Sequence, residues 1–295
     1  VIYNKKPITR KQIITMTKPT IFALASLAAF PLATTAIAGE MVIMPQTSVT
    51  DSGRSLKSAI NSISNPTLHE SAVPMTRARG IVVSHQIPSS INLGGNPTPV
   101  GGDANVYALQ LEFALNDRLS IVASKDGFID LNPDQNIPSA TGFANLAAGL
   151  KYAFIYDEVN DFAMSITGQL ELPTGNRDVF QGNGDGAALL TLSAVKLHNK
   201  WQFSGATGVH LPFDTDASST TGFASAHASY QLTERFTPLV EVNVYHTFSA
   251  GSDGPGTDFE GGGFFNFGSP NAEENATIVT AAVGARYKIN EALSL

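Results

Sequence analysis

The stretch GLKYAFIYDEVNDFAMSITGQLELPTG, residues 149–175, carries apolar side chains at every second position on both sides of a short polar turn. Leu150, Tyr152 and Phe154 share one face before the turn, and Ile166 continues that face after it. Successive side chains of a β-strand point to opposite faces, so this period of two predicts a β-hairpin with one apolar face. The fold then depends on whether that face meets a protein core or lipid.

The same alternation recurs through most of the chain. It predicts ten strands, at residues 79–87, 105–115, 119–129, 143–155, 162–172, 187–197, 201–211, 221–232, 236–247 and 276–289. Most of them are longer than the ~5–6 residues of ordinary soluble strands and close to the ~9–11 residues that a tilted strand needs to cross a bilayer. No apolar run in this part of the chain is long enough for a membrane-spanning helix.

The connections between these strands alternate in length. Short polar turns lie at residues 116–118, 156–161, 198–200 and 233–235, and long linkers at residues 88–104, 130–142, 173–186, 212–220 and 248–275. Tight periplasmic turns and long extracellular loops are typical of outer-membrane β-barrels. The pattern therefore predicts an all-β, antiparallel transmembrane β-barrel, with the apolar face toward lipid and the polar face toward the lumen.

A secreted β-sandwich would show the same alternation, and the aromatic residues separate the two folds. Aromatic residues of the apolar face cluster near the short turns, as in a membrane-interface girdle, at Phe113, Tyr152, Phe154, Phe162, Trp201, Tyr230, Phe236 and Tyr287. A sandwich core would spread such residues along the strands. The facing of residues 187–197 stays open, because neither parity is clearly apolar.

The N-terminal region has the order of an export signal. Lys18 precedes the apolar run TIFALASLAAFPLATTAIAGE, residues 20–40, which ends in a small-x-small pattern at residues 36–38. We expect Met16 to be the start, and residues 1–38 to be upstream residues and a cleaved signal peptide; the alternative is a short buried helix. A Gram-negative outer-membrane location follows from the signal and the barrel together.

Charge and cysteine content exclude several classes. Residues 1–38 hold five of the 18 Lys and Arg residues and none of the 25 acidic residues, so the remaining chain is strongly acidic and nucleic acid is not expected as a partner. The chain has no cysteine, so neither disulfides nor thiolate metal sites are available.

Three regions follow from these patterns. After residues 1–38, residues 39–75 form a periplasmic or plug segment, in which Leu56, Ile60 and Ile63 would share one face of a short helix. That stripe is too short to be stable alone in water, which favours docking inside the barrel. Residues 76–295 form the barrel. We expect about 12 strands when it is complete, with an eleventh strand beginning at residues 294–295 and a C-terminal truncation beyond.

The polar parity identifies candidate lumen residues of mixed charge, which is not the lining of a strongly ion-selective pore. They are Gln110, Glu112, Lys151, Gln169, Glu171, His210, His227, Glu241, Asn243, Arg286 and Lys288. The longest loop contains FEGGGFFNFG, in which Phe259, Phe264, Phe265 and Phe267 are candidates for an apolar site at the extracellular mouth. The alternative is that these four residues pack within the loop or extend the outer girdle.

No catalytic residue, cofactor or metal site is expected. His246 faces outward near a long loop, as the histidine of a barrel lipase would, but no serine stands at a neighbouring outward position. The loop QGNGDG, residues 181–186, has too few oxygens at EF-hand spacing to predict a calcium site. The expected partners are outer-membrane lipid, lipopolysaccharide, the barrel-assembly machinery and a small organic solute.

GLKY at residues 149–152 and ELPTGN at residues 171–176, together with the hairpin plan over residues 76–295, resemble the MetA-pathway phenol-degradation family of outer-membrane proteins. SNPT at residues 64–67 more faintly resembles the fatty-acid and hydrocarbon channels, whose N-terminal segment plugs the lumen. The resemblance implies passive uptake of small, partly apolar and in particular aromatic compounds through a porin-like channel. The alternative is a structural or adhesion barrel without a pore.

Overall fold

The computed structural model describes residues 37–43, 54–93, 96–251, 274–290 and 292–295. Within these ranges the chain is almost entirely β, with two single-turn 3-10 helices, η1 (Leu56–Ser58) and η2 (Arg177–Val179). No helix in the described ranges is both long and apolar enough to cross a membrane.

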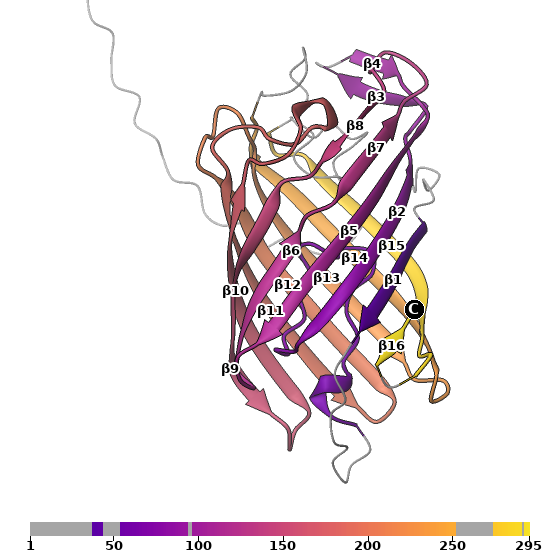
Figure 1. Ribbon diagram of the computed structural model, residues 1–295, viewed down its shortest axis with the longest axis vertical. Coiled ribbons are helices and arrows are strands. Elements are labelled where there is room, and N and C mark those ends of the chain that lie inside the picture. Colours follow the sequence, from indigo (N-terminus) through magenta and orange to yellow (C-terminus); the bar gives the residue numbers. More distant parts are fainter. Residues whose placement is uncertain (1–36, 44–53, 94–95, 252–273, 291) are drawn as a thin grey trace, which may run out of the picture. The chain divides into compact units, whose positions relative to one another are not determined.

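One large antiparallel sheet organises the chain (Figure 1). Its strands are β1 (Ile37–Ile43), β2 (Arg77–Gln86), β5 (Asp103–Ala114), β6 (Leu119–Lys125), β7 (Phe128–Asn132), β8 (Ala140–Phe143), β9 (Leu146–Asp157), β10 (Phe162–Leu172), β11 (Ala187–His198), β12 (Trp201–Pro212), β13 (Thr220–Tyr230), β14 (Phe236–Ser249), β15 (Thr277–Tyr287) and β16 (Leu293–Ser294). A separate hairpin is formed by β3 (Ser90–Leu93) and β4 (Asn96–Pro99). The predicted all-β antiparallel barrel fold is confirmed.

The two ends of the sheet meet at the short strand β16. Its residues Leu293 and Ser294 pair with Ile43 and Val42 of β1. On the other side, Leu295 exchanges two backbone hydrogen bonds with Tyr287 at the end of β15. The hydrogen-bonded order therefore runs from β15 through β14 to β2 and β1, and returns to β15 through β16.

Two of the predicted strands are broken, and three observed strands, β1, β3 and β4, were not predicted. Residues 119–129 divide into β6 and β7 at Asp126 and Gly127, where the φ of Gly127 is +129° and the Asp126 carboxylate accepts the backbone N–H of Leu109 at 2.9 Å. The predicted strand 143–155 is interrupted after Phe143, which ends β8, and it continues from residue 146 as β9. β7 pairs with β8, and β6 pairs with β9. Of the unpredicted strands, β1 pairs with β2 over seven residues, and β3 and β4 pair with each other within the predicted linker 88–104.

The two faces of the barrel wall differ as the period of two requires. Along β9 the outward residues Leu146, Leu150, Tyr152 and Phe154 are exposed, while Lys151 between them is completely buried. Six of the eight expected girdle aromatics are exposed, and Phe162 and Tyr230 are half-buried. The rings of Trp201 and Tyr230 lie 4.9 Å apart. The wall therefore presents an apolar surface outward and a largely polar surface inward.

Strand β11 is apolar on both faces, which explains why its facing could not be read from the sequence. Leu189, Val195 and Leu197 are buried and point inward, whereas Leu190 and Leu192 are exposed. The inward residues need an apolar partner inside the barrel, and the N-terminal region supplies it.

Candidate functional site

The inward face of the wall holds the polar residues named from the sequence. Eight of them are buried: Gln110, Glu112, Lys151, Gln169, Glu171, His227, Glu241 and Asn243. His210, Arg286 and Lys288 are half-buried on the same face. The deep burial of eight polar side chains means that something fills the space in front of them.

Residues 54–76, called here the lumen segment, fill that space. The backbone of Ile60 both donates to and accepts from the side chain of Gln202 on β12, at 2.9 and 2.8 Å. Asn65 donates to Ser225 of β13 at 2.9 Å, and the backbone N–H of Met75 lies 3.2 Å from Glu112 of β5. Since β5 is far from the neighbouring strands β12 and β13 in the order of the sheet, the segment lies inside the barrel.

An apolar cluster packs one side of the lumen segment against the wall. From the segment come Leu56, Ala59, Ala72, Val73 and Met75, and from the wall come Ala163, Val195 and Leu197. Val73 and Leu56 are almost completely buried. Burial of apolar surface stabilises a contact by roughly 25 cal/mol per Å². The cluster gives Val195 and Leu197, two of the inward residues of β11, their apolar partner.

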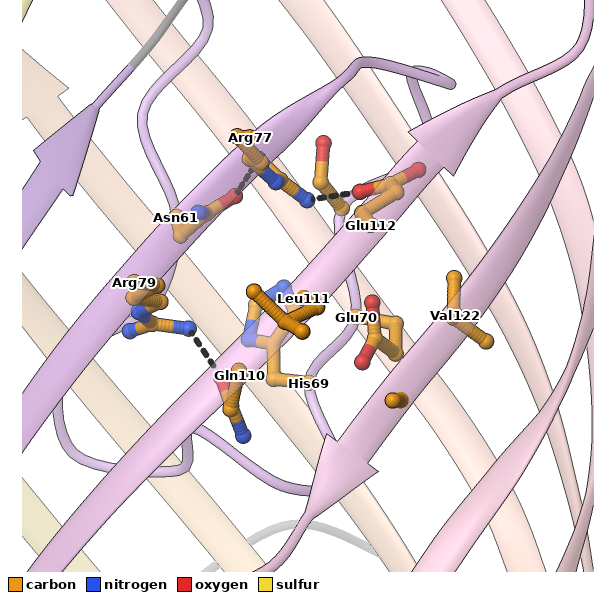
Figure 2. Close-up of a pocket in the computed structure, with 11 residues that line it drawn as sticks. Asn61, His69, Glu70, Arg77, Arg79, Gln110, Leu111, Glu112 and Val122 are labelled. Carbon is orange, nitrogen blue, oxygen red and sulfur yellow. Dashed lines mark hydrogen bonds and ion pairs between the residues drawn. The ribbon is translucent and has the colours of Figure 1, made fainter.

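A group of four buried charges, Glu70, Arg77, Glu112 and Lys151, holds the other side of the segment. Figure 2 shows Glu70, Arg77 and Glu112. Arg77 of β2 lies 2.6 Å from one carboxylate oxygen of Glu112, and Lys151 of β9 lies 2.9 Å from the other. Glu70 of the lumen segment approaches the same Lys151 ammonium at 3.2 Å. The group contains two cations and two carboxylates, and a buried charge group of this kind is tolerated only when its charges are paired.

The residues around these charges complete the connection between segment and wall. Arg77 donates to Asn61 of the segment at 2.6 Å, and Arg79 donates to Gln110 at 3.2 Å and also to the carbonyl oxygen of Ser62. The cavity between them is only about 20 Å³, which is room for about one water molecule.

A second polar connection lies on β13 and β14. The Glu241 carboxylate accepts the backbone N–H groups of Ile63 and Ser64 at 3.0 and 2.7 Å, and the hydroxyls of Ser62 and Ser64. Nδ1 of His227 lies 2.8 Å from the same carboxylate. One wall residue therefore binds four donors from three consecutive residues of the segment.

His69 of the lumen segment is buried close to this connection. Burial lowers the pKa of His69 to about 4, and the positive charge of Arg79 and the nearby His227 act in the same direction, while Glu241 acts against them. The imidazole is therefore neutral at neutral pH.

A third polar group lies where loop 173–186 enters the lumen. Glu171 contacts Lys125 at 2.5 Å, Asn145 at 2.7 Å and the imidazole of His210 at 3.5 Å. The side-chain oxygen of Asn145 accepts the backbone N–H groups of Gly175 and Gly182 at 3.0 and 2.8 Å. The adjoining cavity is about 30 Å³. Asn145 therefore holds the loop over a closed part of the lumen, and Glu171 binds Asn145.

Sequence reasoning named the wall side of these contacts and missed the segment side. Glu70, His69 and Asn61 lie in chain without regular structure, where no periodicity marks a facing. Arg77 and Arg79 were also missed, although their spacing of two, with Ile81 next, is the inward parity of β2. Phe259, Phe264, Phe265 and Phe267 lie outside the described residues. Within the described ranges, no three His, Cys, Asp or Glu side chains are arranged to hold a metal ion.

Comparison with known proteins gives a match to a protein family and no match to a curated protein. A family model described as "Putative MetA-pathway of phenol degradation" matches residues 99–293, which includes every strand from β5 to β15. The match covers well over half of the chain and confirms the resemblance inferred from its motifs. The chain therefore belongs to the family of the MetA pathway of phenol degradation.

Proposed function

We propose that this protein is an outer-membrane channel for the passive uptake of small, partly apolar organic solutes, including aromatic ones. The observation that carries the proposal is the nature of the lumen contents. The inner face of the wall is polar, and the space inside the barrel is filled by the lumen segment as well as by side chains of the wall. Twelve strands give a barrel between the side-chain-filled eight-stranded kind and the open porins of sixteen or more strands.

The lumen segment has the features of a removable plug. It joins no strand of the sheet and contributes only the single turn η1. Side chains or single backbone groups make its polar contacts with β5, β9, β12, β13 and β14. Such contacts can be exchanged for water one at a time, whereas removing a wall strand would break a whole ladder of backbone hydrogen bonds.

The polar cavities that remain, about 20 and 30 Å³, are far smaller than the several hundred Å³ of a typical small-molecule site. Passage through the lumen therefore requires the segment to move. The family description refers to phenol degradation, which agrees with an aromatic solute. On this proposal the outer wall contacts lipid and lipopolysaccharide, and the protein transports its solute without catalysing a reaction.

The rival proposal is a structural or adhesion barrel without a pore, and the small size of the two polar cavities of the lumen favours it. A reversible cross-link between the lumen segment and the wall distinguishes the channel from the pore-less barrel. Asn65 and Ser225 touch through their side chains and the chain has no native cysteine. The double variant Asn65→Cys/Ser225→Cys can therefore be joined by a disulfide or a short bis-methanethiosulfonate linker.

The channel proposal expects solute-induced swelling of liposomes with the reduced variant, loss of swelling on cross-linking, and recovery after reduction. Each single-cysteine variant, treated identically, is the matched control and should keep its uptake. Absence of swelling and of channel steps in planar bilayers in both redox states would establish the pore-less barrel. Uptake that persists after complete cross-linking would show a path that does not need the segment to move.

A further inference from the structure

The inward face of β13 and β14 carries a row of three residue pairs in register. Phe223 pairs with Tyr245, Ser225 with Asn243, and His227 with Glu241. Alternate residues of a strand are about 6.6–6.8 Å apart, so an aromatic pair, a neutral polar pair and an acid–imidazole pair follow one another along the wall. All six side chains are buried.

The lumen segment covers this row with a matching order of groups. Leu68 packs against the cluster of Phe223, Tyr245 and Ala206. Ser62 and Ser64 present their hydroxyls to Glu241, and the Ser64 hydroxyl also accepts a hydrogen bond from Asn243 at 3.0 Å. The segment thus places an apolar body on the aromatic end of the row and hydroxyl donors on its acidic end.

Removal of the segment would leave the acidic end without most of its hydrogen bonds. Four of the five groups bound to the Glu241 carboxylate belong to residues 62–64, and His227 alone comes from the wall. Hydrogen bonds to charged groups are each worth about 1.5–3 kcal/mol. A molecule that brings its own donors therefore offsets part of this loss, and a molecule without donors does not.

Unpartnered polar atoms around the carboxylate show that the row has binding capacity beyond what the segment uses. Nε2 of His227 and the side-chain oxygen of Asn243 are buried and have no hydrogen-bond partner among the described residues. Buried polar atoms of this kind are uncommon and call for water or a ligand. They are available to a solute that takes the place of the segment.

We propose that Phe223, Tyr245, Asn243, His227 and Glu241 form a solute-binding site that residues 62–68 occupy in the closed barrel. Its ligands are neutral compounds with an apolar body and one or two O–H donors at one end. Such a ligand displaces the lumen segment by replacing its hydroxyl donors at Glu241. This inference rests on the proposed function and adds to it the chemistry that selects the solute.

The test measures how often the lumen segment leaves the wall, independently of transport. Ala72 is buried against the apolar cluster of the segment, away from the row. The variant Ala72→Cys, in liposomes, reports departure of the segment through its rate of reaction with a membrane-impermeant maleimide. The two probes are 4-butylbenzene-1,3-diol and its 1,3-dimethyl ether, which share an apolar body and differ in O–H donors.

The diol should accelerate labelling of Cys at position 72 several-fold, and the dimethyl ether should leave the rate unchanged. Adding Glu241→Gln should bring the ratio of rates with and without diol close to one. Adding Glu112→Gln instead is the matched control: it loosens the segment at the four-charge group and should raise the basal rate while keeping the response to the diol. Equal responses to both probes, or a response that survives Glu241→Gln, would overturn the inference.

Uptake of the diol, measured separately by swelling, keeps the inference apart from the proposed function. Accelerated labelling without uptake would support the binding site and contradict the channel. Uptake of both probes at equal rates, with labelling independent of donors, would support the channel and contradict the binding site.

Discussion

The carboxylate of Glu70 lies 3.2 Å from the ammonium of Lys151, and this ion pair joins the lumen segment to the middle of β9. Lys151 is completely buried and also binds Glu112, which in turn binds Arg77. The four charges balance only while the segment is in place. Departure of Glu70 leaves an excess positive charge on the wall, so the pair ties closure of the lumen to electrostatics as well as to packing.

A double-mutant cycle on this pair is the first prediction. Lys151→Met leaves Glu70 buried without its cation and should destabilise the folded barrel by about 3–5 kcal/mol, the usual loss when one partner of a buried pair is removed. Glu70→Gln in the same chain should recover a substantial part of that loss. Urea unfolding in liposomes measures the free energy of unfolding of the single and double variants. Lys196→Met, at an exposed position of β11, should change the stability little, and additive effects at 151 and 70 would refute the coupling.

Gly149 of β9 pairs with Gln169 of β10, the residue after Gly168, and these two glycines give a matched test of wall packing. A methyl group at Gly149 would overlap the carbonyl oxygen of Gly168 and lie 2.6 Å from Cα of Gln169. A methyl group at Gly168 would meet only Leu190, at 3.6 Å. We expect Gly149→Ala to cost about 1–3 kcal/mol or more in unfolding free energy, and Gly168→Ala to be close to neutral. Equal effects in heat-modifiable gel mobility would contradict this packing.

Acid should loosen the lumen segment through His69. The pKa of this buried imidazole is about 4 in the folded chain and 6.5 in its ordinary state. Between these two pKa values, His69 therefore binds a proton in the unfolded chain or the released segment and stays neutral in the closed form. The stabilisation is complete above about pH 6.5 and is lost as the pH falls toward 4, by at most about 1.4 kcal/mol per pH unit.

The measurement for His69 is the thermal midpoint of the barrel at several pH values between 7 and 4.5, compared with His69→Gln. The variant removes the titrating group, so its midpoint should fall less between pH 6.5 and 4.5 than that of the native chain. Parallel curves for the two proteins would assign the acid sensitivity to other groups, such as the carboxylates facing the segment.

A charge on the outward face of the wall should block assembly of the barrel, whereas a charge on the inward face should be tolerated. Val242 is exposed on the apolar face, so Val242→Lys should cost about 2–4 kcal/mol in a bilayer and block assembly. Thr221→Lys, at a half-buried inward position opposite His210 in the register, should assemble. The inward positions Thr167 and Asn243 are unsuitable controls, because both side chains are almost completely buried and leave no room for a lysine. Assembly of both variants, scored by heat-modifiable mobility, would argue against lipid on the apolar face.

The wall was predictable from sequence because the period of two is a local property of each strand. Strand β10 matches the predicted residues 162–172, and Lys151, Gln169 and Glu171 point to the face assigned to them. The prediction became ambiguous at β11, where the apolar partner of the inward face comes from residues 56–75, far away in the chain. Strand β1 was missed because its small and apolar residues also fit the end of an export signal.

The site was only half predictable for a related reason. Glu112, Lys151, His227 and Glu241 could be placed in the lumen by parity. Their partners could not be found, because Asn61, Ser62, Ser64 and Glu70 lie in chain whose conformation is set by the wall rather than by its own periodicity. The splits at β6/β7 and β8/β9 were likewise invisible, since a break in a ladder of hydrogen bonds leaves the alternation of side chains nearly intact.

The span of the contact between residues 62–64 and Glu241 has a consequence for how the protein folds. The partners are separated by about 180 residues of chain, and Glu241 stands on the last strand but one before the closing turn. Contacts of such high sequence separation form slowly, because a long loop must first be closed. The N-terminal region, which is synthesised first, is therefore among the last parts of the chain to reach its final place, because its contacts with β13 and β14 form only after those strands have joined the sheet.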